Sequence, residues 1–133
     1  MSHNTPSLKG YAILVVEDEP LIALDITTTL EDAGATVIGP CASIDHALSL
    51  IDTIGPMSPM DGAVLDVNLG KQTSIPIARF LQARGVPFVF HTGMHFENLA
   101  LLEDFEVPVI HKPSTCTTLT TGIAEQLGNR GVF

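Results

Sequence analysis

The sequence predicts an α/β fold of the doubly wound type, in which a five-stranded parallel sheet carries helices on both faces. Two patterns predict this class. Short apolar runs alternate five times with segments whose apolar residues recur at helical spacing. The first run, residues 12–16, is apolar at every position, which is typical of a strand covered on both sides. Right-handed crossovers return each helix over such a sheet, so the alternation favours parallel strands.

The first strand is therefore expected at residues 12–16. Pro20 suits a first helical turn, where its missing N–H needs no partner, and Gly34 supplies the stop for the helix that follows. The short segment 36–38 predicts the second strand. This first unit is a strand, a helix and a strand, and the pattern then continues along the chain.

In the middle of the chain, Ser43 can cap a second helix that Gly55 closes. Residues 63–66 predict the third strand. A polar loop continues through Ser74 to a third helix, which ends at Gly85.

The last third of the chain holds two further strands, predicted at residues 86–91 and 107–111. A weaker helix is expected between them, over about residues 97–104. Ser114 or Thr115 can cap a final helix.

The length of 133 residues fits one domain that spans the whole chain, with a core over about residues 10–128 and tails at 1–8 and 129–133. No output domain is expected in this chain. Hydrophobic residues make up 45% of the sequence and charged ones 16%, so the chain should be globular rather than disordered.

The net charge argues against some classes of partner, and the cysteines argue against a metal site. Six Lys and Arg against 15 Asp and Glu give a net charge of -9, so nucleic acid and anionic membranes are poor direct partners. Cys41 and Cys116 have no partner at metal-ligand spacing, and no signal or membrane-spanning pattern is evident. These features predict a soluble, cytoplasmic protein whose cysteines are free thiols used in packing.

Polar residues follow four of the predicted strands. They are Glu17, Asp18 and Glu19; Asp66 and Asn68; Thr92; and Lys112. In doubly wound folds ligands bind at the carboxyl ends of the strands, so these groups should share one rim. The acidic residues would repel one another until a cation lies among them, and Mg²⁺ prefers such oxygen ligands. Glu19 is the exception, because it lies where it can complement the dipole of the first helix.

The remaining groups suit phosphoryl transfer. Asp66 could act as a nucleophile and form an acyl phosphate. Lys112 would then pair with one phosphoryl oxygen and Thr92 would hydrogen-bond another, while Mg²⁺ held by Glu17 and Asp18 neutralises further charge.

The set Glu17-Asp18, Asp66, Thr92 and Lys112, in this order on these strand ends, resembles the receiver domain of two-component response regulators. The resemblance covers nearly the whole chain and implies a flavodoxin-like fold of the receiver type. It implies that Asp66 accepts a phosphoryl group from a histidine kinase or a histidine phosphotransfer protein.

The same resemblance implies the ligands of the metal ion. Mg²⁺ would be bound by Glu17, Asp18, the carboxylate of Asp66 and the backbone carbonyl of Asn68. It also implies a cis peptide bond between Lys112 and Pro113, which would aim the lysine.

One branch of the family is closer. The segment 90–95, Phe-His-Thr-Gly-Met-His, is similar to the FATGUY motif of receivers found largely in alphaproteobacteria, often as stand-alone domains in stress signalling. His91 and His95 depart from its Ala and Tyr. Val109 lies where many receivers carry a switching aromatic residue, so the common coupling of Thr and aromatic residue is not expected here.

Nearby residues have simpler interpretations. His91 and His111 directly precede Thr92 and Lys112, so each should point away from the site and serve a structural role. The segment 94–96 is expected in a loop, as either a partner surface or ordinary exposed chain.

These observations predict a single-domain response regulator that catalyses only its own phosphorylation and dephosphorylation. Its signal would leave through a partner protein at the face formed by the fourth helix, fifth strand and fifth helix, or the protein would act as a relay shuttle or phosphate sink. Two alternatives stay open: a pseudo-receiver that docks without phosphorylation, and a Mg²⁺-dependent phosphohydrolase with an aspartyl nucleophile. The hydrolase type needs an Asp two residues after the nucleophile, where this chain has Asn68.

Overall fold

The computed structural model describes residues 6–54, 60–93, 100 and 102–130. Five parallel strands form one sheet in the order β2-β1-β3-β6-β7. Their bounds are β1 Ala12–Val16, β2 Thr36–Cys41, β3 Gly62–Leu65, β6 Phe88–Thr92 and β7 Val109–His111. The predicted doubly wound α/β fold is therefore confirmed.

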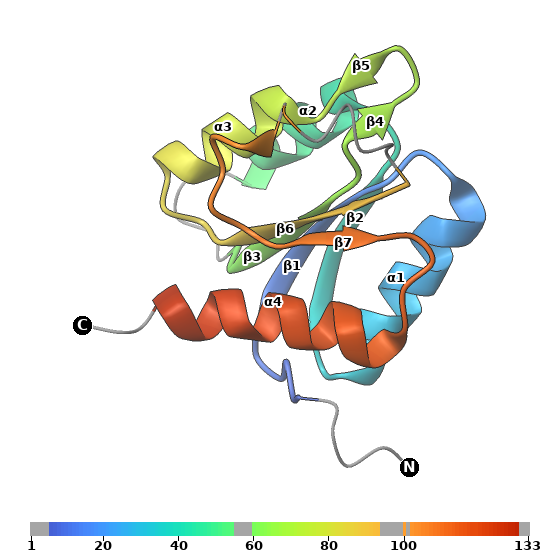
Figure 1. The fold of residues 1–133 in the computed structure, drawn as a ribbon, viewed down its shortest axis with the longest axis vertical. Coiled ribbons are helices and arrows are strands. Elements are labelled where there is room, and N and C mark those ends of the chain that lie inside the picture. Colours follow the sequence, from blue (N-terminus) through green and yellow to red (C-terminus); the bar gives the residue numbers. More distant parts are fainter. Residues whose placement is uncertain (1–5, 55–59, 94–99, 101, 131–133) are drawn as a thin grey trace.

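Helices cover both faces of this sheet (Figure 1). Their bounds are α1 Pro20–Asp32, α2 Ile44–Ile54, α3 Ile75–Ala83 and α4 Cys116–Arg130. Buried residues of α1 and α4 pack together in one core, and those of α2 and α3 pack in a second core on the opposite face. Both faces of the sheet are thus buried, which explains why β1 is apolar at every position.

Alternating residues of each strand contribute to different cores. In β6, Phe88 and Phe90 pack on the α2 and α3 side, whereas Val89 packs on the α1 and α4 side. The two phenylalanines form edge-on ring contacts with each other and with Phe105, with centroids 5.5 to 5.9 Å apart. The prediction that both are core residues is confirmed.

The helix caps follow the predicted chemistry. Ser43 Oγ accepts a hydrogen bond of 3.1 Å from the backbone N–H of His46 at the start of α2. At the start of α4, Thr115 Oγ1 accepts one of 3.0 Å from the N–H of Thr118. Of the two residues predicted to cap this helix, Thr115 does so, which leaves the hydroxyl of Ser114 for another contact.

The loop before α3 and the N-terminal tail differ from the sequence prediction. The polar loop before α3 contains a small antiparallel sheet of β4 (Asn68–Leu69) and β5 (Gln72–Thr73). Leu8, predicted to lie in a tail, is fully buried, and its N–H bonds the carbonyl of Ala33 at 2.7 Å. The helix predicted over 97–104 falls mostly outside the described residues, and so does the segment 94–96.

The two cysteines lie in different environments. Cys41 is buried in the core between the sheet and α2, as predicted, and burial raises the pKa of its thiol. Cys116 is exposed at the start of α4, where its Sγ lies 3.4 Å from Thr29 Oγ1. The packing role predicted for Cys116 is therefore wrong.

None of the described helices is long and apolar enough to cross a membrane.

The second strand is three residues longer than predicted because it continues through an irregular segment. The pairing of β1 with β2 shifts register between Leu14 and Val16, next to a cis peptide bond between Gly39 and Pro40. Gly39 has a φ of +100°, and a Cβ added there would lie 2.8 Å from the backbone N of Cys41. Only glycine fits this conformation and this contact.

Replacing Gly39→Ala should lower the free energy of unfolding by about 3 kcal/mol, because a strained φ adds to a backbone clash. Gly85→Ala is the matched control: Gly85 also has a positive φ, +70°, but nothing lies within 4 Å of the added Cβ. It should cost about 1 kcal/mol. Urea unfolding followed by circular dichroism checks both values, and equal losses would contradict the role given to the close contact.

Candidate functional site

The site lies at the topological switch point of the sheet. The chain leaves β1 toward β2 on one side and later enters β3 on the other side, so the carboxyl ends of β1 and β3 lie side by side where the strand order reverses. Glu17 directly follows β1 and Asp66 directly follows β3. Their backbones are tied to the sheet: the N–H of Asp66 donates to the carbonyl of Val16 at 2.8 Å, and that of Glu17 donates to the carbonyl of Cys41 at 2.9 Å.

Lys112 joins these two carboxylates. Its Nζ lies 2.8 Å from Glu17 Oε1 and 3.2 Å from Asp66 Oδ2. Glu17 and Asp66 are buried, with exposed fractions of 2% and 4%. The ammonium therefore compensates two carboxylates that have lost most of their water.

Glu17, Asp18 and Glu19 form an acidic cluster. One carboxylate oxygen from each lies within 4.8 Å of the others. Glu19 Oε1 also lies 3.8 Å from Lys112 Nζ, and the Glu19 side chain makes no capping hydrogen bond to α1. The sequence assigned Glu19 to the helix dipole alone, whereas the structure places its carboxylate beside the other two.

The neighbouring charges have opposite effects on Asp66. The pKa of Asp66 is raised from 3.8 to about 7. Burial is the largest cause, the hydrogen bond and negative charge of Glu17 add to it, and Lys112 opposes it. For Lys112, burial would lower the pKa, but Glu17 and Asp66 together outweigh it and the pKa is raised. Lys112 thus stays charged, and Asp66 is an unusually basic carboxylate.

Thr92 ends β6 and is fully buried. Its carbonyl accepts a hydrogen bond of 2.9 Å from the N–H of Lys112, which fixes the two backbones side by side. The preceding His91 has its side chain on the opposite face of the sheet, as predicted from strand alternation. It is buried and bonds Ser114, a contact that the sequence did not reveal.

The structure places Asn68 in β4, exposed, two residues after Asp66. The hairpin that it begins is attached to the acidic cluster, because Gly70 N–H donates to Asp18 Oδ2 at 3.1 Å. The predicted cis peptide bond between Lys112 and Pro113 is confirmed. All the residues predicted for the site are thus on one rim, although Asp66 contacts Glu17 and Lys112 rather than joining the three-carboxylate cluster.

The donor set fits Mg²⁺. Four carboxylates face one ammonium, so an excess of negative charge remains after Lys112 is counted. Carboxylate oxygens are hard ligands, and Asp18 and Glu19 are accessible enough to accept an ion that keeps several waters. The cluster that could hold it is Glu17, Asp18 and Glu19.

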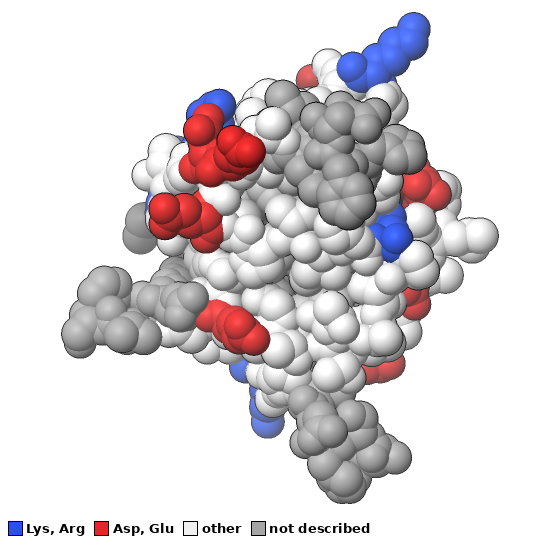
Figure 2. All heavy atoms as spheres, viewed as in Figure 1, with Lys and Arg blue, Asp and Glu red and all other residues white. Residues whose placement is uncertain are grey.

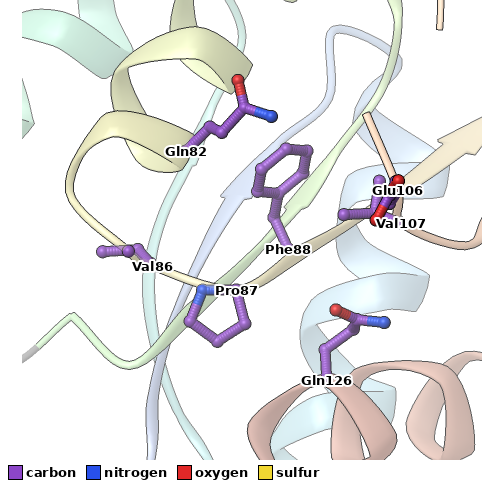
Figure 3. A pocket seen from close by; sticks show the side chains of 8 residues that line it. Gln82, Val86, Pro87, Phe88, Glu106, Val107 and Gln126 are labelled. Carbon is purple, nitrogen blue, oxygen red and sulfur yellow. The ribbon is translucent and has the colours of Figure 1, made fainter. Parts of the chain in front are cut away.

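Other parts of the surface offer less chemistry. A cavity of about 300 Å³ lies at the opposite end of the sheet from the carboxylates, between the start of β6 and the end of α4 (Figure 3). Phe88, Pro87 and Val107 line it together with two glutamines. On the face shown in Figure 2, Lys and Arg side chains are scattered at the edges and form no basic patch.

Comparison with solved structures places this geometry in a family. A response regulator receiver protein from Sinorhizobium medicae is 26% identical with a TM-score of 0.79, over 93% of this chain and 99% of that one. SdrG from Sphingomonas melonis Fr1 is 36% identical with a TM-score of 0.69, over 99% and 100%. The chain belongs to the receiver domains of response regulators.

A receiver domain protein (CheY-like) from Methanospirillum hungatei, 22% identical with a TM-score of 0.76 over 90% of this chain and 95% of that one, shares the fold. No protein-family model and no protein of curated function matches this receiver. The acidic cluster at Glu17, Asp18 and Glu19 is consistent with the Mg²⁺ site of a receiver.

The raised pKa of Asp66 predicts that the free energy of unfolding of the metal-free receiver falls as the pH rises. The folded state holds the Asp66 proton up to about pH 7 and the unfolded state only to about 3.8, so stability is lost as the pH rises between these values. Asp66→Asn removes the titration. The advantage of the variant over wild type should therefore be larger at pH 8 than at pH 4.5, by at least about 1 kcal/mol.

Urea unfolding in the presence of a chelator measures this difference. Asp52→Asn, at an exposed position of α2, is the control and should show no comparable trend. An Asp66→Asn variant whose advantage does not grow with pH would show that Asp66 is an ordinary carboxylate.

Mg²⁺ should stabilise the receiver against heat, because it binds the folded state alone. At one hundred times the dissociation constant the gain is about 2.7 kcal/mol. Asp18→Asn removes one charged ligand while an amide oxygen can still accept from Gly70, so most of the gain should disappear. Glu31→Gln, at an exposed position near the end of α1, should keep it. Thermal unfolding by circular dichroism checks this; identical shifts in both variants would place the ion elsewhere.

Proposed function

We propose that this receiver is a response regulator of a two-component phosphorelay that accepts a phosphoryl group on Asp66. The observation that carries the proposal is the contact of Lys112 with Asp66 and Glu17 at the carboxyl ends of β1, β3 and β7. A carboxylate nucleophile, a cation for phosphoryl oxygens and an acidic cluster for a metal ion are together at one rim, as phosphoryl transfer to a carboxylate requires.

Phosphoryl transfer to Asp66 forms one bond to phosphorus and breaks one. An Asp66 oxygen attacks phosphorus, the bond from phosphorus to the donor histidine nitrogen breaks, and the histidine keeps the electron pair and takes up a proton. The product is an acyl phosphate on Asp66. Lys112 pairs with a phosphoryl oxygen, and the Thr92 hydroxyl donates to another from the end of β6.

Glu17, Asp18, Asp66 and the backbone carbonyl of Asn68 would hold Mg²⁺. The ion supplies positive charge that favours the ionised form of Asp66 and neutralises phosphoryl oxygens. The protein in this role promotes only its own phosphorylation and dephosphorylation.

The donor is a histidine kinase or a histidine phosphotransfer protein, which places the receiver in the cytoplasm. The signal would then leave by protein contact, through a face that includes β7 and α4, or the phosphoryl group would be passed on in a relay. We propose that the chain acts as one receiver domain. Val109, half-buried in β7, takes the position of a switching aromatic residue.

We also propose membership of the FATGUY branch. Phe90, Thr92 and Gly93 match its motif, and Phe90 and Thr92 are both buried in β6. The 36% identity with SdrG over the whole chain supports this assignment.

Neither alternative function has a supporting observation of its own. The phosphohydrolase would need an acid two residues after Asp66, and the structure has an exposed amide at Asn68. A pseudo-receiver that only docks partners would not need Asp66 to be buried against Lys112.

The deciding experiment is the intact mass after incubation with acetyl phosphate and Mg²⁺. Wild type should gain one phosphoryl group, and Asp66→Asn should gain none because its amide is not a nucleophile. Asp52→Asn should react like wild type. Chelation should abolish the gain. A wild type that binds Mg²⁺ but gains no mass would favour a docking module instead.

A further inference from the structure

His91 and Ser114 form a hydrogen bond on the far side of the sheet from the phosphorylation site. His91 is the penultimate residue of β6, and Ser114 comes two residues after Lys112. The atoms His91 Nε2 and Ser114 Oγ are 2.9 Å apart. Within the described part of the chain, His91 Nδ1 has no hydrogen-bond partner, so this bond is the polar contact of the ring.

The ring is buried and uncharged. Its exposed fraction is 4%. Burial is the main cause that lowers its pKa, and the positive charge of Lys112 lowers it further, while the carboxylates of Glu17 and Asp25 oppose the change. At neutral pH the ring is therefore a neutral group that can either donate to or accept from the serine hydroxyl.

The hydrogen bond holds the backbone after Lys112, where the ladder between β6 and β7 has ended. The ladder between β6 and β7 ends with the pair Thr92 and His111, and the N–H of Lys112 then bonds the carbonyl of Thr92 at 2.9 Å. Beyond this point the chain leaves the sheet for α4. The contact of Ser114 with His91 returns the departing segment to β6, so the backbone of Lys112 is held on both sides.

We propose that His91 and Ser114 are positioning residues that hold the segment 112–114 against β6 and thereby keep Lys112 Nζ between Glu17 and Asp66. The effect on phosphorylation rests on the proposed function, whereas the placement of Lys112 does not. A histidine that only fills the core would leave Lys112 unchanged when its hydrogen bond is removed.

The position of the Lys112 side chain can be followed by NMR, because the chain has three lysines, Lys9, Lys71 and Lys112, and their signals can be told apart. In protein labelled with ¹³C-lysine, the Cε signal of Lys112 should move toward the positions of the exposed Lys9 and Lys71 in Ser114→Ala. His91→Phe, which fills similar space without the hydrogen bond, should act in the same way. Ser114→Thr and His91→Gln keep a polar partner and should restore the signal.

Ser43→Ala is the matched control, since it also deletes a serine hydroxyl with one hydrogen bond but at the start of α2. It should leave the Lys112 signal in place even where it lowers stability. An unchanged Lys112 signal in both Ser114→Ala and His91→Phe overturns the proposal.

The rate of phosphorylation by acetyl phosphate gives the second readout. Ser114→Ala should slow it about fivefold, equivalent to about 1 kcal/mol, at unchanged Mg²⁺ affinity. In a Lys112→Ala background the same change should have no further effect, because the group being positioned is gone. An equal slowing in both backgrounds overturns the proposal. A wild type that is not phosphorylated at all refutes the function, and the lysine signals alone then decide the positioning.

Discussion

The contact of one ammonium with two buried carboxylates is the constraint on which the rest of the site depends. Glu17 and Asp66 would destabilise the fold if both were charged and unpaired, because each has lost most of its hydration. Lys112, 2.8 Å from one and 3.2 Å from the other, makes that burial tolerable. The three residues follow three different strands, so their meeting requires the complete sheet.

This dependence explains why an irregular second strand and a hairpin occur close to the rim. The carbonyl of Cys41, past the register shift in β2, accepts from the N–H of Glu17, and the hairpin after β3 donates from Gly70 to Asp18. Both departures from regular structure supply donors or acceptors to the segment after β1. That segment is otherwise a turn that carries three acidic side chains in succession.

Much of this arrangement could be predicted from the sequence, since apolar runs and the polar residues that follow them are local patterns. The strand at residues 12–16, the caps at Ser43 and Thr115, and the rim that gathers Glu17, Asp66, Thr92 and Lys112 all follow from such patterns.

The features that were missed depend on contacts distant in the sequence. Leu8 is buried because α1 offers it a surface and Ala33, just after α1, offers it a carbonyl, and neither can be seen at residue 8 itself. Glu19 was assigned to the helix dipole because its position is a helix start, yet the lysine that attracts it lies 93 positions later. The partner of His91 comes 23 positions later, after β7; strand alternation predicts which way His91 points but not which residue it meets.

The alternation in β6 has a mechanical consequence. Thr92 and His91 are covalent neighbours, yet one is on the side of α2 and α3 and the other on the side of α1 and α4. Because the two side chains share one stretch of backbone, a shift of the backbone at the end of β6 moves both of them. The end of β6 therefore connects the two helix layers directly through the sheet, so a change in one layer can reach the other without passing around the edge of the sheet.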